Sequence, residues 1–262
     1  MDTMSFSRWA IRFHFSAVAS VLLCGASMAF SALQFVASDS RSLSRTDGCV
    51  VAWVSTRGGV IASPCHTNGR GWAAPQFDGR GAVGFSSASG TASPISFPLS
   101  ETGLVARAFI VADGTAAIFC STLLDAPCPL RLMQMEDGAL HFATSSVLST
   151  AELSIDFAQS TEYTPGPHLY EMELAEPCPL CDLYIGGCPA TPAWNRNWNG
   201  IVREAILVSP SASAADAAAI RAYLSKRWDI GRYKSGVTDE LATLRALGIK
   251  TGSVYGSMLI MR

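Results

Sequence analysis

The residues best suited to hold a ligand lie in the segment WNRNWNG, from Trp194 to Gly200. Indole rings offer flat faces to the C–H groups of a sugar, and asparagine and arginine side chains supply hydrogen bonds. We therefore predict a ligand-binding surface formed by Trp194, Asn195, Arg196, Asn197 and Asn199. The alternative is an ordinary loop that leads to the last strand. In both cases we expect Trp198, rather than Trp194, to be the ring that enters the core.

Cysteines form a second reactive set, and those that follow residue 31 are Cys49, Cys65, Cys120, Cys128, Cys178, Cys181 and Cys188. In an exported chain this number favours disulfide bonds. Short separations favour the pairs Cys49–Cys65 and Cys120–Cys128. The last three include a Cys-x-x-Cys motif, but zinc needs four ligands and a thioredoxin-type role needs the motif to open a helix. We interpret them as structural disulfide partners, with zinc binding as the alternative.

Other chemistry has little support in the sequence. It contains no Gly-x-Ser-x-Gly elbow, no Gly-rich phosphate loop and no His-Glu-x-x-His motif. The histidines His66 and His141 are isolated. Calcium is bound by carboxylate and carbonyl oxygens, and the turn aspartates that offer such oxygens are Asp78, Asp113, Asp125 and Asp137. Calcium binding stays open although no motif supports it, and we expect no other metal or cofactor.

Length and charge limit the possible functions. A chain of 262 residues is long enough for one large β-sandwich. Its formal charge of −2, with both signs dispersed, gives no electrostatic reason to expect a nucleic-acid partner. Only 15% of the residues are charged and the mean hydropathy is positive. Such values fit a sandwich with small polar turns, and they also fit a membrane-associated chain.

An apolar run without charged residues extends from residue 15 to residue 38, after two arginines. As a signal peptide it has a basic start, an apolar centre and small residues at plausible cleavage positions. As a single membrane helix it is long enough, and the arginines would stay on the cytoplasmic or matrix side. We therefore expect a secreted protein or one anchored with its main domain on the extracytoplasmic side. An organelle membrane is the alternative.

The central part of the chain consists of short apolar segments separated by turn residues. Asp113-Gly114 predicts a hairpin between residues 104–111 and 116–121. Asp137-Gly138 predicts a second hairpin, between residues 130–135 and 139–144. Short strands broken by turns at regular intervals indicate an all-β sandwich or jelly roll.

The stretch from Trp198 to Gly231 combines a strand with a helix. Residues 201–208 alternate and are rich in β-branched side chains, as in a half-buried strand. Ser213 and Asp216 then form a capping box that predicts a helix start. The apolar residues of that helix recur at steps of three and four, at Ala217, Ile220, Leu224 and Trp228.

This stretch resembles the C-terminal signature of concanavalin A-like (laminin-G-like) lectin and glucanase domains. In that family a Gly-Ile-x-Glu strand precedes a helix reading Ala-x-x-Tyr-Leu-x-x-Lys-Trp. The matching residues are Gly200, Ile201, Glu204, Ala219, Tyr223, Leu224, Arg227 and Trp228, with arginine where lysine is usual. Weaker similarities extend the resemblance over residues 33 to 231. It implies a concanavalin A-like β-sandwich with one short helix near the end.

Glucanases of this superfamily cut sugars with carboxylates in a Glu-x-Asp-x-x-Glu pattern on one strand. The corresponding acids here are Glu171, Glu173 and Glu176, with no aspartate among them. Glu173 and Glu176 lie on opposite faces of a regular strand. We therefore predict that the chain is not an enzyme.

We predict a leader or membrane helix over residues 1–31, the sandwich over 32–232 and an extension over 233–262. The extension should contain a helix from Thr238 to Leu247, followed by a strand. The expected function is a non-catalytic, lectin-like binding module for a glycan or a surface protein. The alternative is a structural accessory subunit of a membrane complex, anchored by the N-terminal helix and in contact with the other subunits.

Overall fold

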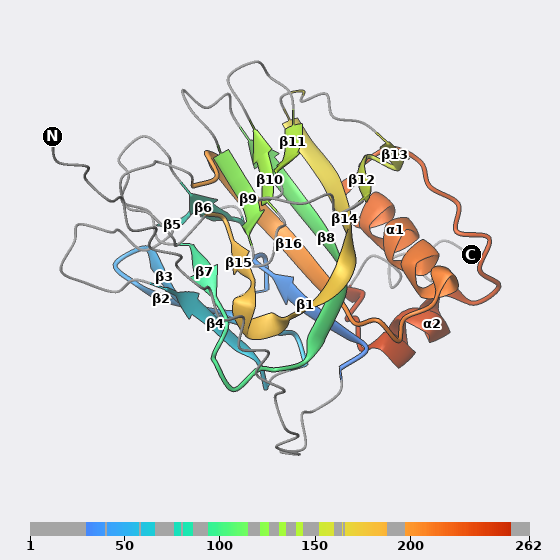
Figure 1. Ribbon diagram of the computed structural model, residues 1–262, viewed down its shortest axis with the longest axis horizontal. Coiled ribbons are helices and arrows are strands. Elements are labelled where there is room, and N and C mark those ends of the chain that lie inside the picture. The colour runs from blue at the N-terminus through green and yellow to red at the C-terminus, as the bar shows by residue number, and fades with distance from the viewer. Residues whose placement is uncertain are drawn as a thin grey trace, which may run out of the picture.

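The computed structural model describes residues 30–39, 41–57, 59–65, 76–79, 81–85, 94–114, 121–125, 131–134, 140–143, 152–159, 164, 166–187 and 197–252. These residues form mostly strands, in two antiparallel sheets with two short helices (Figure 1). The fold is an all-β sandwich, which confirms the predicted fold class.

Three long strands make up the centre of the larger sheet: β8 (Leu104–Gly114), β14 (Gly166–Pro179) and β16 (Gly200–Val208). Strand β8 lies between the other two, so Ile110 is paired with Tyr170 on one side and with Ala205 on the other. The sheet also contains β1 (Ala32–Val36), β2 (Leu43–Thr46), β3 (Cys49–Val54), β5 (Gln76–Phe77), β6 (Val83–Phe85), β12 (Glu152–Ile155) and β13 (Ala158–Gln159).

The second sheet runs in the order β11 (Leu140–Ala143), β10 (Arg131–Gln134), β9 (Ser121–Asp125), β15 (Tyr184–Ile185), β7 (Ile95–Ser96) and β4 (Ile61–Pro64). Strand β4 also pairs with β3 and so links the two sheets. A core that includes Phe35, Trp53 and Trp198 is formed by buried side chains of both sheets. Aromatic edges meet there, as where Phe35 contacts both Trp53 and Phe97.

One predicted hairpin is wrong and the other is confirmed. Strand β8 continues through Asp113 and Gly114, because β14 and β16 pair with it on both sides up to that point. The following strand, β9, belongs to the second sheet and pairs there with β10 and β15. Strands β10 and β11 do form an antiparallel pair, with Arg131 opposite Ala143.

Helix α1 (Ala214–Trp228) covers the outer face of the larger sheet. It begins as predicted, because the Asp216 backbone N–H donates to Ser213 Oγ at 3.2 Å and the Ser213 N–H donates to Asp216 Oδ2 at 2.8 Å. Its apolar face joins a second core on that side of the sheet, with Ala217, Ile220 and Leu224 among its buried members.

A second helix, α2 (Glu240–Leu247), packs beside α1. Its cap is Asp239 rather than the expected Thr238, because the Asp239 carboxylate accepts from the Ala242 N–H at 2.8 Å. Leu244, Leu247 and Ile249 are buried in the second core. Within the described ranges, no helix has both the length and the apolar character needed to cross a bilayer. Residues 1–29 of the predicted leader lie outside those ranges.

Candidate functional site

Trp198 anchors the end of the sandwich at which the predicted ligand surface lies. Its side chain is fully buried, and its ring meets that of Tyr170 edge-to-face with centroids 5.9 Å apart. The indole Nε1 donates to the Asp113 carbonyl oxygen at 3.3 Å. A Cβ atom on Gly114 would lie only 2.5 Å from the ring, so the absence of a side chain there makes room for it. Trp198 is a core ring, as predicted.

The neighbouring Asn197 joins this end to the second sheet. Its side chain is 2% exposed, and its backbone forms a parallel bridge with Thr122 of β9. The Thr122 hydroxyl is fully buried and has no hydrogen-bond partner within the described part of the chain. A buried hydroxyl without a protein partner can be satisfied by a water molecule. Sequence reasoning missed Thr122, because no local signal connects residue 122 with residue 197.

The structure places two of the five predicted ligand residues together. Asn197 and Asn199 flank the buried Trp198, and Asn199 is half-buried. Trp194, Asn195 and Arg196 lie outside the described residues. The described part of the predicted surface is therefore a pair of asparagines on either side of a buried indole. Asparagine side chains can both donate and accept hydrogen bonds.

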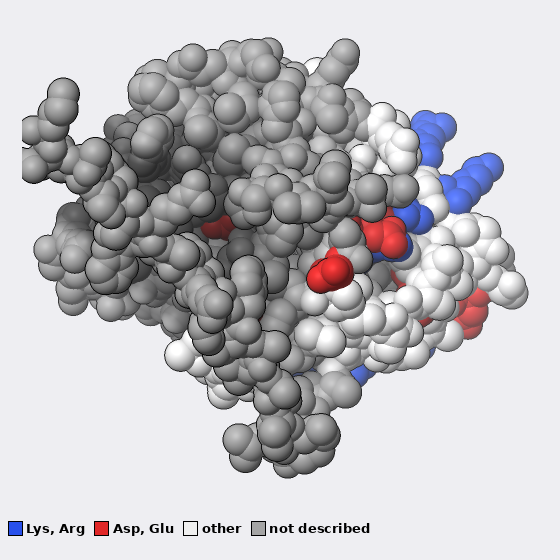
Figure 2. Space-filling view, in the orientation of Figure 1, with Lys and Arg blue, Asp and Glu red and all other residues white. Residues whose placement is uncertain are grey.

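Two of the three glutamates of the acidic strand segment form ion pairs, and Glu173 and Glu176 are exposed. Glu171 is buried and binds Arg221 of α1 through two hydrogen bonds, each 2.6 Å long. This bidentate contact raises the pKa of Arg221 above its usual range. Glu173 lies on the same face of β14 and pairs with Arg107. Figure 2 shows side chains of both signs on the side of the molecule where α1 packs.

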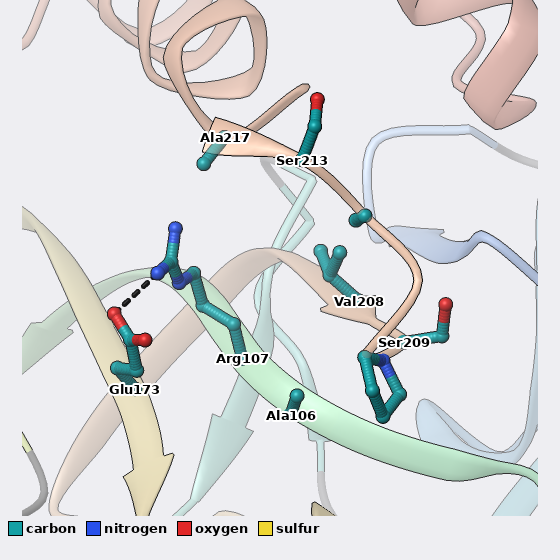
Figure 3. Close-up of a pocket in the computed structure, with 9 residues that line it drawn as sticks. Ala106, Arg107, Glu173, Val208, Ser209, Ser213 and Ala217 are labelled. Atoms are coloured by element: carbon teal, nitrogen blue, oxygen red, sulfur yellow. Dashed lines mark hydrogen bonds and ion pairs between the residues drawn. The ribbon is translucent and has the colours of Figure 1, made fainter. Parts of the chain in front are cut away.

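A small pocket lies next to this ion pair, between β8, β14 and the start of α1. Its volume is about 110 Å³, and Arg107, Glu173, Ser213 and Ala217 are among the residues that line it (Figure 3). Pockets that hold small ligands begin at about 300 Å³. The pocket is therefore too small for a sugar ring with its hydroxyls, and Glu173 is the only carboxylate among its described lining residues.

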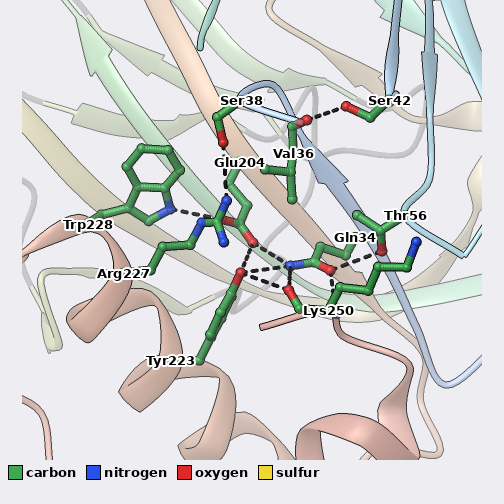
Figure 4. A network of polar contacts seen from close by, with 10 residues as sticks. All are labelled: Gln34, Val36, Ser38, Ser42, Thr56, Glu204, Tyr223, Arg227, Trp228 and Lys250. Atoms are coloured by element: carbon green, nitrogen blue, oxygen red, sulfur yellow. Dashed lines mark hydrogen bonds and ion pairs between the residues drawn. The ribbon is translucent and has the colours of Figure 1, made fainter. Parts of the chain in front are cut away.

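Four of the eight residues that carry the sequence resemblance meet in a buried polar network between β16 and α1 (Figure 4). Glu204 has no exposed surface. Its Oε1 accepts from Gln34 at 2.7 Å and from the Tyr223 hydroxyl at 3.0 Å. Its Oε2 accepts from Trp228 Nε1 at 2.8 Å and lies 3.0 Å from Arg227 Nε. Glu204, Tyr223, Arg227 and Trp228 therefore attach the helix to the sheet.

Burial of this network shifts the pKa values of two of its side chains, Glu204 and Tyr223. Loss of water raises the pKa of Glu204, while the Arg227 charge and the hydrogen bonds act in the opposite direction. Burial also raises the pKa of the Tyr223 hydroxyl, and the nearby Glu204 adds to that effect. Gln34 extends the network to the C-terminal segment, because its amide donates to the Lys250 carbonyl at 3.2 Å and accepts from the Lys250 N–H at 2.8 Å.

Four of the cysteines are described: Cys49, Cys65, Cys178 and Cys181. No disulfide bond joins any two of these four, and the other partners proposed from the sequence, Cys120, Cys128 and Cys188, lie outside the described residues. The predicted disulfides stay a prediction. Burial and the adjacent Asp182 carboxylate raise the pKa of the Cys181 thiol. A raised pKa disfavours the thiolate that metal binding and redox catalysis require.

The proposed calcium ligands do not converge where they are described. Asp78 closes a turn by accepting from the Ala82 N–H at 2.9 Å, Asp113 lies within β8, and Asp125 ends β9. Asp137 lies outside the described residues. Among the residues that the structure places, no group of three or more His, Cys, Asp or Glu side chains is arranged to hold a metal ion.

No family model and no curated protein matches this chain. A solved structure to which it is similar is Trypanosoma rangeli sialidase in complex with the inhibitor DANA, with a TM-score of 0.36 and 12% sequence identity. The match covers 81% of this chain and 32% of the sialidase chain. A sialidase is an enzyme, so this finding contradicts our prediction that the chain is not an enzyme, and we withdraw that prediction. At this TM-score the likeness assigns neither an activity nor a substrate to the chain.

Proposed function

We propose that the chain is a lectin-like binding module with a concanavalin A-like sandwich, which binds a glycan or a protein surface at the sandwich end formed around Trp198. The observation that carries this proposal is the buried, hydrogen-bonded Trp198 between Asn197 and Asn199. Trp198 fixes the backbone directly after the segment that contains Trp194, Asn195 and Arg196. These three residues carry an indole, an amide and a guanidinium group.

Two further features support binding at this place. A residue on a fixed backbone loses less entropy when it binds a ligand, and Asn197 and Asn199 stand on the backbone that Trp198 fixes. The Thr122 hydroxyl beside Asn197, which has no partner among the described residues, leaves a donor and an acceptor for a bridging water. Aromatic and amide groups together bind a sugar through stacking and directed hydrogen bonds.

The test is a glycan-array screen followed by titration of any glycan that binds. Trp194→Ala should weaken binding at least tenfold and leave the thermal unfolding midpoint unchanged, because Trp198 is the buried ring. Arg196→Ala should weaken binding less. Arg232→Ala is its matched control, since Arg232 is an exposed arginine on the α1 side of the larger sheet. Equal affinity of all three variants, or an array without a single binder, would defeat the glycan version of the proposal.

The accessory-subunit alternative has one observation in its favour, the uncharged run from residue 15 to residue 38. The N-terminal residue of the mature protein distinguishes the two functions. A chain that starts near residue 30 supports the binding module, whereas a chain that keeps residues 1–29 and co-purifies with membranes supports the anchored subunit.

A further inference from the structure

Away from the sandwich end, three side chains lie in a line where the β12–β13 hairpin meets the start of β14. His168 Nδ1 lies 2.6 Å from Asp156 Oδ2, and His168 Nε2 lies 3.0 Å from Thr164 Oγ1. A hydroxyl, an imidazole and a carboxylate at these separations form the arrangement of an activated nucleophile, its general base and the group that orients the base.

The backbone holds the carboxylate in place. Asp156 stands in the hairpin turn with a φ of 49°, a left-handed conformation that aspartate tolerates better than most residues. Its N–H donates to the Leu169 carbonyl at 3.0 Å, and its Oδ1 accepts from the Leu169 N–H at 2.9 Å. One carboxylate oxygen is therefore fixed to β14, one residue after His168, and the other faces the imidazole.

The contact with Asp156 bears on the tautomer of the imidazole. A carboxylate accepts hydrogen bonds, so this contact favours the tautomer with the proton on Nδ1, and in that tautomer the Nε2 lone pair can take the threonine proton. After it takes that proton, the Nε2–H can donate to the Thr164 carbonyl oxygen, which lies at 2.9 Å. Asp156 then faces an imidazolium ion and stabilises it.

Burial separates the roles of the three side chains. The His168 side chain is 14% exposed, and its ring meets Tyr170 edge-to-face. Thr164 is exposed, so a reactant can reach its hydroxyl from solvent. A shielded base next to an accessible hydroxyl is the arrangement that nucleophilic catalysis needs.

We propose that Thr164 is a nucleophile for acyl transfer from small carboxylic esters, with His168 as the general base and Asp156 as a positioning residue. Thr164 Oγ forms a bond to the ester carbonyl carbon, and its proton passes to His168 Nε2. The ester C–O bond breaks, and the leaving oxygen takes that proton and departs as an alcohol. Water then attacks the acyl-threonine along the same proton path, which releases a carboxylic acid and restores the hydroxyl.

The experiment uses the full chain and p-nitrophenyl acetate, with nitrophenol release followed by absorbance and the acetylated residue located by peptide mass spectrometry. We expect one acetyl group on Thr164. Thr164→Val should abolish its acetylation, and His168→Gln should slow it about 100-fold, the usual contribution of a general base. Asp156→Asn should slow it by a smaller factor while the circular dichroism spectrum stays unchanged.

Two further variants separate chemistry from a purely structural role. Thr164→Ser keeps the hydroxyl and should retain acetylation, whereas the isosteric Thr164→Val removes it. Thr46→Val is the matched control, because Thr46 is an exposed threonine on β2, and this variant should react like the unchanged protein. Absence of acetyl from Thr164 would overturn the proposal, and so would the same rate of acetylation in His168→Gln.

Discussion

The helix-covered face of the larger sheet and the sandwich end at Trp198 both bury polar side chains, but they differ in how those side chains are satisfied. On the helix side, Glu204 is bound by three hydrogen-bond donors and a guanidinium, and Glu171 by a bidentate arginine. At the sandwich end, the Thr122 hydroxyl has no partner within the described residues. A hydrogen-bonded network of this kind holds a helix and a sheet together, whereas the Thr122 hydroxyl can still take a hydrogen bond from a water molecule.

The most recognisable sequence pattern joins two elements of the fold. The Gly-Ile-x-Glu strand and the Tyr-Leu-x-x-Arg-Trp helix resemble a lectin and glucanase signature, yet their polar residues face each other inside the molecule. Their role is to attach α1 to β16. The candidate ligand residues lie in a segment with no such pattern.

The largest expected effect is on the helix side. Glu204→Ala should lower the free energy of unfolding by about 3–5 kcal/mol, because it leaves buried donors and the Arg227 charge without their acceptor. Urea denaturation measures this change. Glu176→Ala is the control, since Glu176 is exposed on β14, and it should change stability by less than about 0.5 kcal/mol. Similar losses for both variants would show that the network contributes little.

At the sandwich end, Gly114→Ala should cost about 1–3 kcal/mol, because the new methyl group would meet the Trp198 ring. The displaced indole would also shift Asn197 and Asn199, so ligand affinity should fall together with stability. Calorimetric unfolding and the glycan titration measure the two effects. A variant with unchanged stability would contradict the tight packing of this ring.

The raised pKa of Glu204 predicts how the stability of the protein depends on pH. Its pKa in the folded state is raised above that in the unfolded state, which is about 4.3 for glutamate. Below that pH Glu204 is protonated in both the folded and the unfolded state, so its titration does not change the free energy of unfolding. Above it the unfolded state releases the proton first, so the stability contribution of this group falls until the pH passes the folded-state pKa.

Glu204→Gln removes this titration. The free energy of unfolding of the glutamine variant, relative to the unchanged protein, should therefore rise as the pH goes from about 4 towards neutral. Urea unfolding at a series of pH values measures the difference. A difference that does not vary with pH would mean that Glu204 titrates alike in both states.

The smallest effect is expected at the rim of the helix-covered face. Glu173 is half exposed and pairs with Arg107, so Glu173→Ala should change stability by about 0–1 kcal/mol. Glu171→Ala should cost more, because Glu171 is buried and its removal leaves Arg221 without its bidentate partner. Chemical denaturation of both variants measures their free energies of unfolding. A larger loss of stability in Glu173→Ala than in Glu171→Ala would contradict this order.

Local patterns in the sequence determined much of the fold. The capping box at Ser213 and the apolar face of α1 could both be predicted, because each depends on residues close together in the chain. The burial of Trp198 was also predicted, although the groups that pack around it are distant in the sequence. The all-β class followed from short apolar segments and turn residues. The prediction was wrong where the local turn preference competes with strand pairing. Asp113-Gly114 favours a turn, but β14 and β16 pair with it on both sides and keep it within β8.

Only the tertiary structure decided which polar side chains meet. Gln34 binds Lys250 across 216 positions, and Thr122 comes to lie beside Asn197 because β9 belongs to the second sheet. The line formed by Asp156, His168 and Thr164 depends on the way the hairpin closes on β14. Such contacts leave no period in the sequence, because they depend on strand order and register rather than on the preferences of neighbouring residues.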